Sequence, residues 1–170
     1  YWMLNRFYNG GRQALGLSAL INGSGFMVTT ALLKKVGGWQ TSTMTEDYEF
    51  TAQCLLAGEK VQYVSDAVIY DEQPLTFLQS WRQRRRWSTG SVQGMAKYFG
   101  RLGKAAIQRR SRVCADLALT FITPAVQGVS LLVGLASLVL GAYRVVEFNL
   151  IRPTQLLLLA VGVVGLALLL

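Results

Sequence analysis

Apolar and polar positions recur with different periods along the chain, and each period predicts a different element. Short apolar runs at 17–21, 61–65 and 67–70 are bounded by glycine or polar residues, as is typical of strands. Helical spacing predicts two short helices, at 31–36 and 46–57, and each follows a threonine suited to the N-cap. The first 70 or so residues are therefore expected to contain short strands and short helices.

A long helix is predicted after Pro74, because proline suits the first turn of a helix. Residues 117–142 then form a run of 26 positions without a charge. At about 1.5 Å of rise per residue, a helix of this length crosses a hydrocarbon layer about 30 Å thick. Pro124 predicts a kink inside this helix, and residues 156–170 begin a second apolar run.

The composition strengthens the prediction of membrane segments. Hydrophobic residues make up 52% of the chain and charged residues only 15%, which is too apolar for an ordinary soluble domain. Ten lysines and arginines, and no acid, lie between Arg82 and Arg112. Such a block could meet nucleic acid or phospholipid headgroups; the apolar run beside it favours lipid, and we expect no nucleic-acid partner. The positive-inside rule places residues 1–112 in the cytoplasm of a multi-pass protein of the cell (plasma) membrane.

Several kinds of chemistry are excluded by residue usage. The chain has no histidine and only two cysteines, which argues against a Ser-His-Asp nucleophile, a Cys/His metal site and a disulfide framework. It begins with Tyr1 and stops inside an apolar run, so we expect an internal piece of a longer protein.

The first candidate site lies in the basic part of the long helix. Gln83, Arg86 and Trp87 stand at i, i+3 and i+4 and therefore share one face. An amide, a permanent cation and a flat aromatic ring on one face could hold a phosphate and a sugar side by side. The alternative is a basic amphipathic helix on an anionic membrane surface, with tryptophan as the interfacial anchor.

The second candidate is the acidic start of the helix at 46–57. Glu46 or Asp47 could act as a general base toward a sugar hydroxyl within hydrogen-bond reach. The alternative is ordinary capping, because acids in the first turn, Glu49 included, offset the helix macrodipole.

A turn cluster, Gly23-Ser24-Gly25, is the third candidate. Its glycines would let the backbone approach a ligand closely. The alternative is a turn with no further purpose.

Together these features resemble the family-2 glycosyltransferases, the membrane-embedded group with the polysaccharide synthases. The order and spacing of the motifs carry the resemblance, which covers essentially the whole chain. The matching motifs are Asn22-Gly23-Ser24-Gly25, Val36-Gly37-Gly38-Trp39, Thr45-Glu46-Asp47, Asp71-Glu72 before Pro74, and Gln83-x-x-Arg86-Trp87.

The resemblance implies a partial GT-A type α/β domain that leads through amphipathic interface helices into transmembrane helices. The expected parts are the C-terminal part of the catalytic domain (1–74), basic interface helices carrying Gln-x-x-Arg-Trp (75–112), a transmembrane helix (113–143), an extracytoplasmic loop (144–155) and the start of a second transmembrane helix (156–170).

The activity implied is inverting transfer of a sugar from a nucleotide diphosphate donor, expected to be a UDP-sugar. The acceptor would be a hydroxyl of a growing β-linked polysaccharide at the cytoplasmic membrane face. Asp47 would be the general base, with Glu46 beside it. The donor diphosphate and the acceptor sugar would be bordered by Gln83, Arg86 and Trp87.

The glycines and serine of the turn, Gly23, Ser24 and Gly25, would lie near the acceptor end. The family's nucleotide-binding acids and Asp-x-Asp metal ligands match nothing in this chain. The resemblance thus implies Mg²⁺ or Mn²⁺ for the full enzyme, with ligands outside this chain, and we expect the piece alone to have no transfer activity.

Other functions remain open at this point. A non-processive enzyme that glycosylates a lipid carries similar motifs, so the acceptor is a glycan or a lipid. A basic membrane-anchored module without activity, and a transport component with a cytoplasmic domain, also fit the apolar and basic segments.

Overall fold

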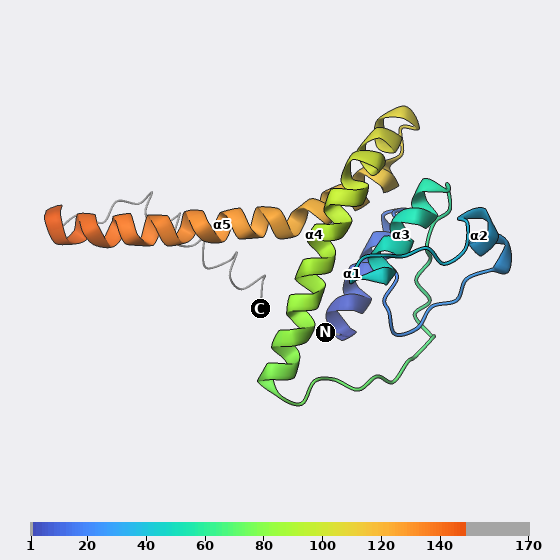
Figure 1. Cartoon of the computed structure of the whole chain (residues 1–170), viewed down its shortest axis with the longest axis horizontal. Coiled ribbons are helices and arrows are strands. Elements are labelled where there is room, and N and C mark those ends of the chain that lie inside the picture. Colours follow the sequence, from blue (N-terminus) through green and yellow to red (C-terminus); the bar gives the residue numbers. More distant parts are fainter. Residues whose placement is uncertain (1, 149–170) are drawn as a thin grey trace. The chain divides into compact units, whose positions relative to one another are not determined.

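The computed structural model describes residues 2–148, which divide into two compact units at residues 121 and 122. The described residues form five helices (Figure 1): α1 Trp2–Ala14, α2 Thr30–Lys35, α3 Glu46–Leu56, α4 Phe77–Gln108 and α5 Arg112–Phe148. The first unit holds α1 to α4 and the first turns of α5, and it contains every candidate site residue.

Extended segments replace the three predicted strands, at 17–21, 61–65 and 67–70. One backbone hydrogen bond joins the first two segments, from Ala19 N to Val61 O at 3.0 Å. Further backbone groups are satisfied by side chains, as where Asn9 Oδ1 accepts from Leu20 N at 2.9 Å. A strand needs a repeated ladder of backbone pairs, so the strand predictions were wrong for the described residues.

The long basic helix begins at Phe77 and not near Pro74. Thr76 and Gln79 form a reciprocal capping box, in which Thr76 Oγ1 accepts from Gln79 N at 3.3 Å. This arrangement satisfies two backbone amides that the helix start leaves without partners, and it fixes the start better than the proline does.

The core lies where α3, α4 and the first turns of α5 meet. On α3, the side chains of Phe50, Cys54 and Leu55 form a buried stripe, and each is less than 4% exposed. The largest group of buried apolar residues consists of Leu20, Ala52, Leu55, Tyr98, Leu102, Ala105, Cys114, Leu117, Ala118 and Phe121. This packing fixes α4 beside α3.

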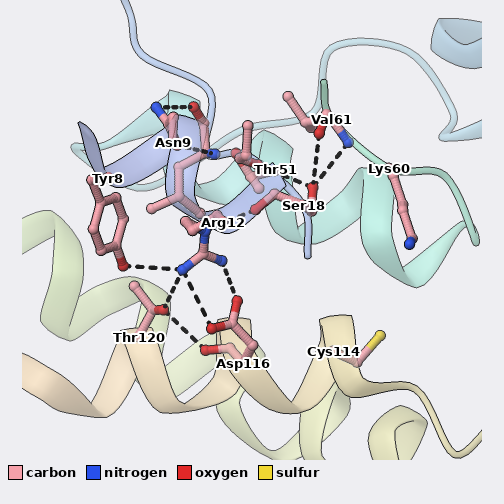
Figure 2. Close-up of polar contacts among 12 residues, drawn as sticks. Tyr8, Asn9, Arg12, Ser18, Thr51, Lys60, Val61, Cys114, Asp116 and Thr120 are labelled. Atoms are coloured by element: carbon pink, nitrogen blue, oxygen red, sulfur yellow. Dashed lines mark hydrogen bonds and ion pairs between the residues drawn. The ribbon is translucent and has the colours of Figure 1, made fainter. Parts of the chain in front are cut away.

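A buried arginine ties α1 to the first turns of α5 (Figure 2). Arg12 forms an ion pair with Asp116 and donates hydrogen bonds to Ser18 O at 2.8 Å and Tyr8 Oη at 3.0 Å. Thr120 Oγ1 lies 3.5 Å from the same guanidinium. A buried guanidinium must have such partners, because desolvating an unpaired charge is costly.

The apolar helix α5 continues through Pro124. Among the described residues, its segment Arg112–Gly141 is long and apolar enough to cross a membrane, by length and composition alone. Residues 144–148 are helical, where the sequence predicted the start of a loop. The rest of that loop, 149–155, and the second apolar run, 156–170, lie outside the described residues.

Gly94 generates a prediction about this packing. A Cβ at Gly94 would lie 2.4 Å from Cε1 of Phe121, a side chain that is 1% exposed. We expect Gly94→Ala to lower the free energy of unfolding by about 1–3 kcal/mol through overpacking, measured on the detergent-solubilised protein.

Gly100→Ala on the same helix is the matched control, since nothing lies within 4 Å of a Cβ there. It should raise the free energy of unfolding by about 0.5–1 kcal/mol through helix propensity. Equal stability of the two variants would contradict the packing described for α4.

Candidate functional site

A pocket of about 500 Å³ brings together segments that are far apart in the sequence. It is lined by Asn22, Gly23, Ser24, Met44, Thr45, Glu46, Asp47, Tyr48, Asp71, Glu72, Gln73, Gln83, Arg86, Trp87 and Ser91. All the predicted site residues except Gly25 are in this lining. Asn22, Met44, Tyr48, Gln73 and Ser91 were not predicted to lie near a ligand.

Asp47 joins two of the predicted motifs directly. Its Oδ2 accepts a hydrogen bond from Gly23 N at 2.9 Å, and its Oδ1 accepts from Tyr48 N at 2.8 Å. Burial raises the pKa of Asp47 above its ordinary value, and the charge of Glu46 adds to this, although the two backbone amides act in the opposite direction. A raised pKa makes this carboxylate a better proton acceptor at neutral pH.

Gly25 lies beside the pocket lining and has a different role. Its φ is +126°, and a Cβ there would lie 1.8 Å from Cδ1 of Ile69. Both facts require glycine, because a side chain would be strained and would collide. The turn is thus held against the extended segment that leads to Asp71 and Glu72.

The turn is also supported by stacked aromatic rings. Phe26 stacks on Trp39 with ring centroids 5.8 Å apart, and Trp39 lies 4.6 Å from Phe50 of α3. The predicted Gly37-Gly38-Trp39 motif therefore places an indole between the turn and α3. Such pairs add stability beyond the area they bury.

The predicted face of α4 does point into the pocket. Gln83, Arg86 and Trp87 line it, and the two intervening arginines do not. Gly90 continues this face, and a Cβ there would lie 2.7 Å from Thr45 N. The absence of a side chain at Gly90 lets α4 contact the backbone that leads into α3, so the two candidate motifs share one pocket.

The buried carboxylate of Glu49 also connects α3 with α4. Glu49 is 0% exposed, and its Oε2 accepts from Ser42 N and Thr43 N, both at 2.7 Å. Its Oε1 accepts from Lys97 Nζ at 2.6 Å and from Tyr98 Oη at 2.9 Å. Burial alone would raise the pKa of Glu49, but these four donors lower it to about 2. Glu49 therefore remains charged at neutral pH.

The pocket does not form a divalent metal site by itself. Four carboxylates, those of Glu46, Asp47, Asp71 and Glu72, border it. In the part of the chain that the structure describes, no three or more histidine, cysteine or acidic side chains are grouped so as to hold an ion. These carboxylates are therefore not grouped as a ligand set for the implied Mg²⁺ or Mn²⁺.

Comparison with known proteins decides the family. Residues 2–170 match the family model described as glycosyl transferase family group 2. The chain belongs to this family. Its membership supports a GT-A-type domain, of which the described residues form a helical part.

Three relatives similar to this chain carry different names. The chain is 30% identical over 114 residues to the "Probable glycosyltransferase YdaM" of Bacillus subtilis. It is 29% identical over 96 residues to the "Beta-monoglucosyldiacylglycerol synthase" of Synechocystis sp.. It is 36% identical over 69 residues to the "Probable glucomannan 4-beta-mannosyltransferase 3" of Arabidopsis thaliana.

The alignments cover 67%, 56% and 41% of this chain, in the same order, and 26%, 20% and 12% of the three relatives. The chain thus spans about a quarter or less of the relatives that it matches. No solved structure matches it.

Proposed function

We propose that this chain is part of a membrane glycosyltransferase that moves a sugar from a nucleotide diphosphate donor, expected to be a UDP-sugar, to an acceptor hydroxyl with inversion. The acceptor is a growing β-linked polysaccharide at the cytoplasmic membrane face. The observation that carries this proposal is the shared pocket of Asp47, Arg86 and Trp87.

The reaction uses these groups in complementary roles. Asp47 accepts the proton of the acceptor hydroxyl as the oxygen of that hydroxyl bonds to the anomeric carbon of the donor sugar. The bond from the anomeric carbon to the diphosphate oxygen breaks at the same time, and the diphosphate leaves with the electron pair. Attack from the face opposite the leaving group inverts the anomeric configuration.

The charges around the pocket suit this reaction. The Arg86 guanidinium offsets negative charge on the departing diphosphate, and its planar fork matches phosphate oxygens. Trp87 offers a flat ring to the apolar face of a sugar, and the Gln83 amide can donate to a hydroxyl. The backbone amide of Gly23 donates a hydrogen bond to Oδ2 of Asp47 at 2.9 Å, and this bond fixes the orientation of the base.

A membrane location follows from α5 and the basic block before it. One segment, Arg112–Gly141, could span a bilayer. The arginines and lysines that precede it favour the cytoplasmic side for the pocket. In this proposal membrane lipids surround the part of α5 that follows Phe121, and the protein is multi-pass in the plasma membrane.

A lipid acceptor is the second candidate. One of the relatives is named a β-monoglucosyldiacylglycerol synthase and another a glucomannan mannosyltransferase, so the relatives include proteins named for both acceptor classes. Product analysis with purified membranes separates these candidates, because a lipid product partitions into organic solvent and a polysaccharide does not.

The family resemblance also leads us to propose Mg²⁺ or Mn²⁺ for the whole enzyme, held by residues outside this chain.

The first test concerns the base. Asp47→Asn in the full-length enzyme should abolish transfer, by about 10²–10⁴-fold, because the amide cannot accept the hydroxyl proton. Transfer of radiolabelled sugar by membranes of equal enzyme content measures this effect, and membrane insertion should remain normal.

Asp66→Asn is the matched control, because Asp66 is exposed and lies outside the pocket lining. Undiminished transfer by Asp47→Asn would refute the base assignment.

The second test concerns the donor diphosphate. Arg86→Ala should weaken binding of the nucleoside diphosphate by about 10–100-fold, since a charged hydrogen bond contributes about 1.5–3 kcal/mol. Arg85→Ala, on the same helix but outside the pocket, should change it by less than about twofold. Isothermal titration measures both, and equal losses from the two variants would contradict the assignment.

A further inference from the structure

The buried carboxylate of Glu49, on α3, holds the loop that leads into Asp47, and its contacts reach both this loop and α4. Its two oxygens contact different parts of the structure. Oε2 accepts from the backbone amides of Ser42 and Thr43, and Oε1 accepts from Lys97 and Tyr98 of α4. Moving this carboxylate would therefore disturb the loop and α4 together.

Two further hydrogen bonds join the loop to α4. Lys97 Nζ also donates to Ser42 Oγ at 2.8 Å, and Met44 N donates to Gln93 Oε1 at 3.0 Å. Thr43 Oγ1 closes the loop on itself by donating to Thr45 O at 3.1 Å. Each residue from 42 to 45 thus has a polar contact that fixes its backbone or side chain just before the acidic motif.

These contacts join the loop to α4, the helix that carries Gln83, Arg86 and Trp87. Lys97 stands eleven residues after Arg86 on the same continuous α4. A helix is stiff over three turns, so a shift at Lys97 moves Arg86 as well. The separation between Asp47 and Arg86 is therefore set by contacts outside the pocket, because Glu49, Lys97 and Tyr98 do not line it.

We propose that Glu49 is a positioning residue for the transfer reaction: it holds the Ser42–Thr43 backbone and α4 in register, so that Asp47 faces the sugar bound by Arg86 and Trp87. This inference rests on the function proposed above. The carboxylate acts through the loop and touches no substrate itself.

The test is steady-state kinetics of Glu49→Gln in the full-length enzyme. A glutamine offers one acceptor oxygen, so it cannot satisfy the two loop amides and the two α4 donors at once. We expect kcat to fall by about 10–100-fold, because displacement of a base by about 1 Å has effects of this size. KM for the nucleotide sugar should stay within about threefold, because a shift of α4 as a whole leaves Arg86 and Trp87 in place relative to each other.

Glu59→Gln is the matched control. Glu59 also pairs with a lysine, Lys35, at 2.6 Å, but this pair is exposed and lies away from the acidic motif. Its kcat should equal that of the unmodified enzyme. All rates are divided by the amount of folded enzyme, from size-exclusion chromatography in detergent, so that a loss of fold does not count as a loss of kcat.

Glu49→Asp keeps the proposal testable if Glu49→Gln fails to fold. Aspartate retains the buried charge but is one methylene shorter, so it cannot reach the loop amides and α4 together. Its kcat should also fall at least about tenfold. An unchanged kcat per folded enzyme in either variant would overturn the proposal.

Asp47→Asn assayed in parallel separates the two proposals. Full activity of Glu49→Gln beside an inactive Asp47→Asn would refute the positioning role and leave the base assignment intact. A low kcat in Glu49→Gln beside an active Asp47→Asn would refute the base assignment and still support a role for Glu49 in holding the loop.

Discussion

Glu49 carries a full negative charge into the interior between α3 and α4, and the residues around it are arranged to satisfy that charge. A buried carboxylate without donors would be strongly destabilising. Here two backbone amides, a lysine and a tyrosine donate to it at 2.6–2.9 Å. Since the amides belong to the loop before Asp47 and the side chains belong to α4, one charge fixes both walls of the pocket.

Close backbone packing complements this electrostatic contact. Gly90 brings α4 against Thr45, and Gly94 brings the same helix against Phe121. Glycine at both places removes the side chains that would keep the elements apart. The loop, α4 and the first turns of α5 therefore form one packed unit.

Much of the candidate site could be predicted from sequence, because its motifs are local. The spacing of Gln83, Arg86 and Trp87 determines a shared helix face whatever surrounds it. The strands were mispredicted because an apolar run is compatible with a strand, but pairing depends on neighbours that the run does not specify. Glu49 was interpreted as a capping acid, because the residues around it in the sequence do not indicate that Lys97, 48 residues later, forms a hydrogen bond with it.

The central claim is that the loop before Asp47 lies directly beside α4 in the intact enzyme. Thiol cross-linking tests it, with cysteines at Met44 and Gln93, two exposed positions joined by a hydrogen bond of 3.0 Å. A short bifunctional thiol reagent should link this pair within one chain, as detected by mass spectrometry of the joined peptides. Cysteines at Met44 and Lys104, about 16 Å further along α4, should stay unlinked. Absence of the link between 44 and 93, or equal linking of both pairs, would contradict the shared pocket.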